Sequence, residues 1–408
     1  MASVQLYNKD ENKYRVLLCC GTKEDGKPNR MSKIIVAKSE TEAKKIASDM
    51  EYEFRHKKDF ITLKSFSDTW MEEQKGELSK STLQTYKGIL KNYIIPYLGN
   101  YAVKDISKKD VKNYLRELKK KENLSEKTIR NNFMLLSSLL TYAIDDDIID
   151  VNVCKQIKKK PKAVCKKVNY YEKKDVDKMF ECLELEINEN HLNWNMYSMY
   201  DKETLEKINT YTGKMYRIFV YLALASACRR SELFGLDWDD VNFEKKFITI
   251  NKVSLRTTED GVYIKDSLKN GDASKAVTLP DNMMEMLAEY KTEQEEIRKL
   301  AGNRWVKSDR VFIATAGGKM SAPGAGMIPD TISSWFSKFI KKYNLPELTL
   351  HGLRHTSISY LINAGMNIKA VAEHAGHRHT SITTGTYTHV SEENDRGCAD
   401  MSGTLLDK

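Results

Sequence analysis

The chain has 408 residues, of which 30% are charged and 41% are hydrophobic, and its formal net charge is +9. No apolar run approaches the roughly 20 residues that cross a bilayer, and the start, MASVQLYNKDENKYR, has no signal-peptide core. The composition therefore excludes a membrane-spanning protein and predicts a cytoplasmic chain of several domains.

The positive charge is concentrated in the first part of the chain. Residues 1–168 contain 35 Lys+Arg and 23 Asp+Glu, a net charge of +12, whereas the other residues contain 31 and 34, a net charge of -3. A basic surface gains affinity for nucleic acid by releasing counterions from the phosphates, although lysine-rich solubility explains the same excess. The seven cysteines are scattered and lack zinc-site spacing, so reduced thiols and no structural metal are expected.

A small sheet with one helix is predicted within residues 11–57. Residues 14–20 and 31–37 are rich in strand formers, and a turn-rich stretch separates them. Ser39 and Glu42 form a capping-box pattern that begins a helix through Phe54. Because so short a segment has a thin core, we expect an accessory binding domain.

Residues 60–150 are predicted to be helical. Apolar residues recur at i, i+3 and i+4, and the helices with this spacing span 69–74, 81–98, 107–121 and 125–144. Ser79, Ser107 and Ser125 are expected caps, and Pro96 with Gly99 is expected to end the second helix. On polar helix faces, Lys87 and Arg130 are candidate phosphate contacts, with a solvated surface as the alternative.

A basic connector is predicted at residues 155–168. Seven lysines lie within residues 155–167, and Pro161 blocks helix continuation. The candidate DNA contacts in this segment are Lys158, Lys159, Lys160 and Lys162. The pattern fits either a solvated hinge or a strap along a DNA backbone.

Residues 169–395 are predicted to combine helices with a short antiparallel sheet. The expected strands are 247–251, 261–265 and 276–279, and the expected helices are 215–227, 282–300, 330–342, 352–364 and 367–375. The polar stretch 181–212 supports no firm prediction.

A histidine-rich cluster indicates the chemistry of this last part. Six of the eight histidines fall between His351 and His389, a window that also holds Arg354 and Tyr387. Arginines neutralise anionic oxygens, imidazoles move protons and a hydroxyl can act as nucleophile. The cluster therefore predicts a site for phosphodiester chemistry.

Three motifs in order resemble the signature of the tyrosine recombinases. They are Ala225-Ser-Ala-Cys-Arg229-Arg230-Ser-Glu232, then His351-Gly-Leu-Arg354, then His377 followed by Tyr387. The chain is similar to the integrase branch of temperate phages and conjugative transposons over nearly its whole length. Two departures stand out, because Ala375 and Gly385 occupy positions where the family has larger apolar residues.

The resemblance implies an α+β multidomain fold. The implied parts are an arm-type DNA-binding domain with a small β-sheet plus helix (1–58), an all-α core-binding domain (59–154), a basic linker (155–168), a mostly α catalytic domain with a small antiparallel sheet (169–390) and a tail that docks on a neighbouring protomer (391–408). A frayed terminus is the alternative for the tail.

The resemblance also implies roles for six residues. Arg229 and Arg354 would clamp the scissile phosphate, and His351 would carry a proton or hydrogen-bond the phosphate. His377 would donate a hydrogen bond, and Tyr387 would be the nucleophile. Lys269 would protonate the leaving 5′ oxygen, with Lys265 and Lys275 as nearby alternatives.

The reaction that the resemblance implies is site-specific recombination. Tyr387 would form a 3′-phosphotyrosyl link, and paired exchanges would pass through a four-way junction without a cofactor or a metal. The implied partners are double-stranded DNA at core and arm sites, a homo-tetramer and an excision factor, with no membrane. The alternatives are a type IB topoisomerase-like enzyme and a catalytically idle DNA-binding regulator.

Overall fold

A computed structural model of the chain forms two compact units, residues 1–165 and 166–408, and each is described by itself. The residues that the structure describes are 3–8, 12–22, 28–56, 61–121, 124–162, 169–192, 200–266, 274–315 and 322–376. Within these residues, no helix has the length and apolar character to cross a membrane.

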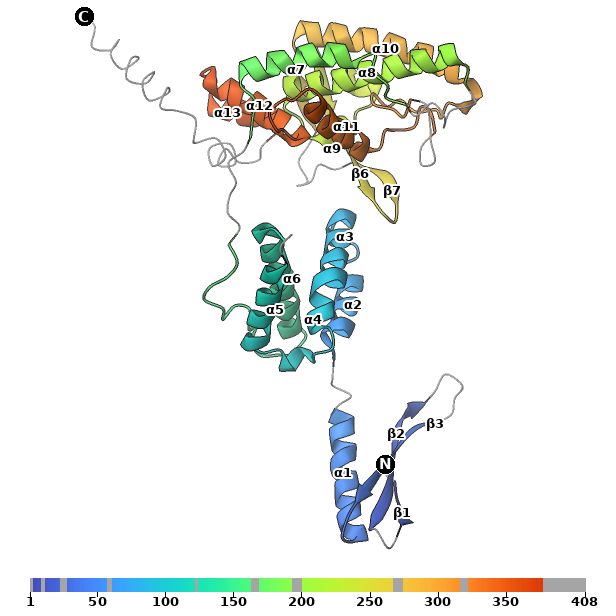
Figure 1. Ribbon diagram of the computed structural model, residues 1–408, viewed down its shortest axis with the longest axis vertical. Coiled ribbons are helices and arrows are strands. Elements are labelled where there is room, and N and C mark those ends of the chain that lie inside the picture. Colours follow the sequence, from blue (N-terminus) through green and yellow to red (C-terminus); the bar gives the residue numbers. More distant parts are fainter. Residues whose placement is uncertain are drawn as a thin grey trace, which may run out of the picture. The chain divides into compact units, whose positions relative to one another are not determined.

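The N-terminal segment is an antiparallel sheet with one helix (Figure 1). Its elements are β1 (Ser3–Asn8), β2 (Lys13–Thr22), β3 (Pro28–Val36) and α1 (Glu40–His56). The Glu42 N–H donates to Ser39 Oγ at 3.2 Å, as the capping pattern predicts. Strand β1 was not evident from the residue pattern, and its pairing with β2 completes the sheet.

A helical bundle follows, built from α2 (Leu63–Glu73), α3 (Lys80–Ile89), α4 (Ile95–Leu98), α5 (Lys108–Lys120) and α6 (Glu126–Asp145). The hydroxyls of Ser79, Ser107 and Ser125 each accept an N–H from the first turn, which confirms the predicted caps. Leu136, Leu139 and Leu140 on α6 are fully buried in the core of this bundle.

The helix predicted over residues 81–98 is interrupted. Between α3 and α4, residues Leu90–Ile94 form a π-helical turn, and the Ile95 N–H donates to the Leu90 carbonyl. Pro96 has no N–H to offer the preceding turn, so the ladder widens just before it. The pattern of apolar residues continues through this turn, which is why it did not reveal the break.

The second unit is mostly helical. Its helices are α7 (Lys173–Glu186), α8 (Lys202–Ser226), α9 (Arg230–Leu233), α10 (Asp281–Ala301), α11 (Pro329–Lys342), α12 (Leu350–Asn363) and α13 (Ile368–Ala375). The last four agree with the predicted ranges within two residues. Helix α7 was not predicted, and α8 begins well before the expected start because Asp201 caps it, accepting the Thr204 N–H at 2.8 Å.

Two small sheets accompany these helices. Strands β4 (Val241–Asn242), β5 (Phe247–Ile250) and β8 (Lys275–Thr278) form one, and β6 (Val253–Thr257) pairs with β7 (Gly261–Lys265) in the other. The three expected strands are therefore present but do not form one sheet, because β7 pairs with the unpredicted β6. This hairpin projects from the helical body (Figure 1).

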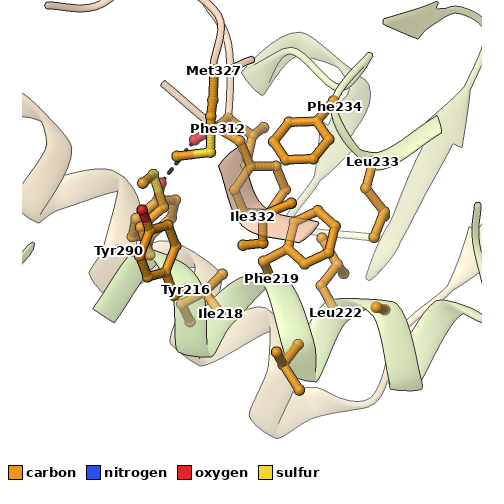
Figure 2. Close-up of a cluster of buried hydrophobic side chains, with 14 of the residues drawn as sticks. Tyr216, Ile218, Phe219, Leu222, Leu233, Phe234, Tyr290, Phe312, Met327 and Ile332 are labelled. Atoms are coloured by element: carbon orange, nitrogen blue, oxygen red, sulfur yellow. Dashed lines mark hydrogen bonds between the residues drawn. The ribbon is translucent and has the colours of Figure 1, made fainter. Parts of the chain in front are cut away.

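An aromatic core holds α9 against α8 (Figure 2). The Phe219 ring stacks on Phe234 at 5.0 Å between centroids and meets Phe312 edge-on at 5.1 Å. All three rings are at most 2% exposed. Because Phe234 directly follows α9, this packing fixes the turn on which the first motif lies.

Candidate active site

Arg229 lies at the turn between α8 and α9. The backbone leaves α8 through Ala227 in the left-handed region, with φ of 49°, and Arg229 then caps α9. Arg229 Nη1 donates to Glu232 Oε1 at 2.6 Å, and the Arg229 N–H donates to Glu232 Oε2 at 2.6 Å. These two hydrogen bonds to the buried Glu232 hold the arginine in place, although its side chain is 43% exposed.

Arg354 approaches the same turn from α12. Its side chain is 3% exposed, and its Nη1 donates to the Ala227 carbonyl at 2.6 Å. This contact spans 127 positions in the sequence and ends two residues before Arg229. The structure thus brings the two predicted arginines to one place.

Lys275 is the lysine that the described structure places beside the arginines. It lies on β8, where it pairs with Ile250 of β5, and its Nζ is buried without a hydrogen-bond partner among the described residues. Burial lowers the pKa of Lys275, and the charges of Arg354 and Arg229 lower it further, against Cys228 and Glu232. Lys265 ends β7 and Lys269 lies outside the described residues.

His351 lies in the first turn of α12, three residues before Arg354. Partial desolvation and the positive charges of Arg354 and Arg229 lower its pKa, so the ring is neutral near pH 7. Its ring meets that of His355 edge-on at 4.6 Å between centroids. A neutral imidazole beside two guanidinium groups can accept a proton or a hydrogen bond.

Helix α13 ends at the same site. Burial and the charge of Lys275 lower the pKa of His374. Gly376 closes α13 with φ of 71°, and a Cβ at this position would lie 3.1 Å from Lys275 Cδ and 3.3 Å from Nζ. Gly376, the residue that directly precedes His377, therefore lies beside Lys275. His377 and Tyr387 themselves lie outside the described residues.

A groove of about 1000 Å³ opens beside the arginines and is lined by Arg229, Arg230, Ser333, Lys341 and His351 among others. Arg230 is held there by α11, because its Nη1 donates to Ser333 Oγ at 2.6 Å and to Asp330 Oδ1 at 3.2 Å. The other Asp330 oxygen accepts from Arg256 Nη1 at 3.2 Å. The lining therefore combines cations and hydroxyls with one carboxylate, Glu347.

The depressed histidine pKa values predict acid sensitivity. The pKa of His355 falls to about 4 through burial and the charges of His351 and Arg354, and those of His351 and His374 are also lowered. Because unfolded histidines titrate near 6.5, the unfolded chain binds more protons below that pH. The free energy of unfolding should therefore decrease as the pH falls from about 6.5 towards 4.

Urea unfolding midpoints across this range measure the effect. A His355→Gln variant, which cannot titrate, should show a flatter pH dependence than the wild type. Identical pH profiles for the two proteins would contradict the assignment.

One contact of the site was not identified from the sequence, because nothing there indicated that the Ala227 carbonyl accepts a hydrogen bond from Arg354. Lys275 was identified only as an alternative to Lys269. A small residue before the arginine motif carries no signal for a left-handed turn. The alternation of residues 276–279 revealed the strand but not the depth of the lysine at its start.

Comparisons with known proteins show which family the chain resembles. The phage integrase family matches residues 199–394, and the phage integrase N-terminal SAM-like domain matches residues 62–119. The chain is 27% identical to a protein named "Tyrosine recombinase XerC-like" from Caldanaerobacter subterraneus subsp. tengcongensis, over 92% of each chain. It is also 27% identical to the transposase from transposon Tn916 of Enterococcus faecalis, over 42% of each.

Solved structures share the fold. The Tn1549 transposon integrase, in complex with a circular intermediate DNA, superposes with a TM-score of 0.63 and 20% identity, over 84% of this chain and 99% of that one. A lambda integrase tetramer bound to a Holliday junction gives a TM-score of 0.52 and 14% identity over 93% of each. The predicted fold class is confirmed.

The two family matches follow one another along the chain and cover more than half of its residues. The chain belongs to the phage integrase family, and it is a tyrosine site-specific recombinase.

Proposed function

We propose that Tyr387 attacks a DNA phosphodiester to give a 3′-phosphotyrosyl link and a free 5′ hydroxyl. The 5′ hydroxyl of a partner duplex then attacks that link and releases the tyrosine, so one phosphodiester replaces another. Two such exchanges integrate or excise a mobile element through a four-way junction. The convergence of Arg229, Arg354 and Lys275 carries this proposal, since it gathers three cations where phosphate charge would develop.

Arg229 and Arg354 hold the non-bridging oxygens of the scissile phosphate. Each guanidinium presents a fork of donors that suits a phosphate better than the single ammonium of lysine. Glu232 and the Ala227 carbonyl fix the two forks by hydrogen bonds. These contacts hold the donors in place before DNA arrives, so little reorganisation accompanies the reaction.

The histidines complete the phosphate site. His351, neutral and next to both arginines, takes the proton of the attacking phenol or hydrogen-bonds the phosphate. His377 follows Gly376 directly and donates a hydrogen bond to the same centre. The phenol, with an ordinary pKa of about 10, needs the surrounding cations and this base to become a nucleophile.

Lys275 protonates the leaving 5′ oxygen in this proposal, with Lys269 as the alternative. Its desolvated ammonium has a lowered pKa and therefore gives up a proton more readily. Replacing the bridging 5′ oxygen by sulfur tests the role, because a thiol has a pKa of about 8.5 and leaves without a proton donor. The Lys275→Ala variant should cleave ordinary DNA slowly. It should cleave the DNA with the bridging 5′ sulfur at nearly the wild-type rate.

Lys269→Ala serves as the matched variant, and Arg229→Lys as the control. If the sulfur substitution restores cleavage only in the Lys269→Ala variant, Lys269 is the proton donor instead of Lys275. The Arg229→Lys variant should not be rescued, since it lacks phosphate clamping rather than a proton.

The assembly is a homo-tetramer on double-stranded DNA with core and arm sites. The lambda integrase tetramer bound to a Holliday junction supports this arrangement, because the folds agree over 93% of each chain. The proposal also has residues 391–408, which lie outside the described residues, dock on a neighbouring protomer, and it has an excision factor set the direction of the reaction. Sequencing the DNA that flanks the gene would give the attachment sites needed for the assays.

Covalent trapping tests the proposed reaction. A nicked duplex that carries the attachment site loses its short 5′ fragment after cleavage, so the protein should remain bound through Tyr387 on a denaturing gel. Absence of any covalent complex would indicate an idle DNA-binding regulator. Covalent complexes with plasmid relaxation but without joined partner duplexes would indicate a topoisomerase-like enzyme.

A further inference from the structure

We propose that Arg310 is a positioning residue for the reaction. It holds the point where the chain leaves α9 and thereby sets where Arg229 presents its guanidinium. This role rests on the proposed function, in which Arg229 holds the scissile phosphate. Arg310 lies outside all three sequence motifs, so its part in the site follows from the packing alone.

Helix α9 cannot orient Arg229 by itself. It has only four residues, Arg230–Leu233, and a single helical turn is not stable without packing partners. Glu232, which accepts two hydrogen bonds from Arg229, belongs to this turn. A displacement of α9 would therefore move the arginine together with the carboxylate that holds it. The direction of the Arg229 guanidinium thus depends on what holds the two ends of α9.

Arg310 holds the end of α9. The Gly235 N–H donates to the Glu232 carbonyl at 3.0 Å and closes the turn. The Gly235 carbonyl accepts a hydrogen bond from Arg310 Nη1 at 2.6 Å. Two positions later, Asp237 pairs with Arg310 in an antiparallel bridge, so the backbone of Arg310 also lies beside this segment. Because a charged donor makes a stronger hydrogen bond than a neutral one, Arg310 fixes the carbonyl that follows α9.

An ion network fixes Arg310 in turn. Its Nη1 lies 3.0 Å from Asp237 Oδ1, and Lys252 Nζ lies 2.6 Å from Asp237 Oδ2. Lys252 also pairs with Asp240 at 3.1 Å. The side chain of Arg310 is 17% exposed and that of Asp237 is 22% exposed, so salt screens these charges weakly. The positive charge of Arg310 is therefore engaged within the protein.

The packing around Arg310 leaves the end of α9 little room. A Cβ on Gly235 would lie 2.4 Å from the Lys252 carbonyl oxygen, so the backbone that leads into β6 lies directly against it. A Cβ on Gly326 would lie 3.6 Å from Arg310 Cγ, which places the stem of the arginine against the segment that leads into α11. Helix α11 in turn holds Arg230 through Ser333. One side chain therefore connects the supports of both arginines in the first motif.

Single-turnover cleavage of saturating attachment-site DNA by the full chain tests this role. Arg310→Met keeps the unbranched stem and removes the donors, while Asp237 retains Lys252 as a partner, so the variant should fold. Cleavage should slow by about tenfold or more, since a small misplacement of a reacting group has effects of this size, while DNA affinity stays unchanged. Arg310→Lys should recover most of the lost rate, because its ammonium can donate to the same carbonyl.

A second background separates positioning from stability. In the Arg229→Lys variant, the guanidinium that Arg310 is proposed to position is absent. Adding Arg310→Met to this variant should therefore slow cleavage by less than about twofold, because the effects of residues that act as one unit are not additive. A residue that only stabilises the fold would cause the same fold-loss in both backgrounds.

Arg217→Met is the matched control. Arg217 lies on α8 in the same unit, its side chain is 21% exposed, and its Nη1 lies 2.6 Å from Glu184 Oε2. The substitution removes a comparable ion pair, made with α7 rather than with the end of α9. The melting temperature should fall about as much as in Arg310→Met, whereas cleavage should match that of the wild type.

Three results would each overturn the positioning role: wild-type cleavage by Arg310→Met, an equal loss of cleavage in Arg217→Met, or the same fold-loss with and without Arg229. These results leave the proposed function intact, because the wild type still forms the covalent complex. Absence of that complex in the wild type would instead reject the proposed function, and the role of Arg310 with it.

Discussion

A Tyr387→Phe variant is expected to bind attachment-site DNA as the wild type does and to form no covalent complex. The change removes one hydroxyl oxygen, the atom that would bond to phosphorus, and leaves the ring in place. A denaturing gel with the nicked duplex measures the covalent product, and a native gel measures binding. The loss should be complete within detection, because phenylalanine has no alternative nucleophilic atom.

Tyr360 provides the matched control for this substitution. It lies on α12, the helix of His351 and Arg354, and is 56% exposed. Tyr360→Phe should therefore retain cleavage. If Tyr387→Phe still forms the adduct, or if Tyr360→Phe loses it, the proposed nucleophile is wrong.

Arg229→Lys and Arg354→Lys are each expected to slow cleavage by about 10²–10³. Both keep a positive charge but lose the forked donors that grip two phosphate oxygens. Single-turnover cleavage under saturating DNA measures the chemical step apart from binding.

Arg230→Lys supplies the comparison at the adjacent position. Its guanidinium is engaged by Ser333 and Asp330 rather than aimed at the same turn as Arg354. Cleavage at saturating DNA should change only a few-fold. Equal losses at all three positions would contradict the proposal, because the effect would then not be specific to the two guanidinium groups that are proposed to hold the phosphate.

Local residue patterns determined most of the helices. The hydroxyls of Ser79, Ser107 and Ser125 accept N–H groups from the first turns of their helices, and the last two helices of the described residues agree with their apolar periodicity. Caps and helical spacing act within a few residues, so a single sequence reveals them. The order of the motifs likewise indicated the family, and the resemblance implied the roles of Arg229 and Arg354 without a structure.

Only the tertiary structure decided the contacts that depend on distant parts of the chain. Strand β7 pairs with β6 rather than β5, and Lys275 emerges beside the arginines because β8 adds to β5 there. Strand pairing, side-chain burial and the approach of positive charges depend on how separate segments pack against one another. The spacing of residues along one segment does not indicate which other segments it will contact.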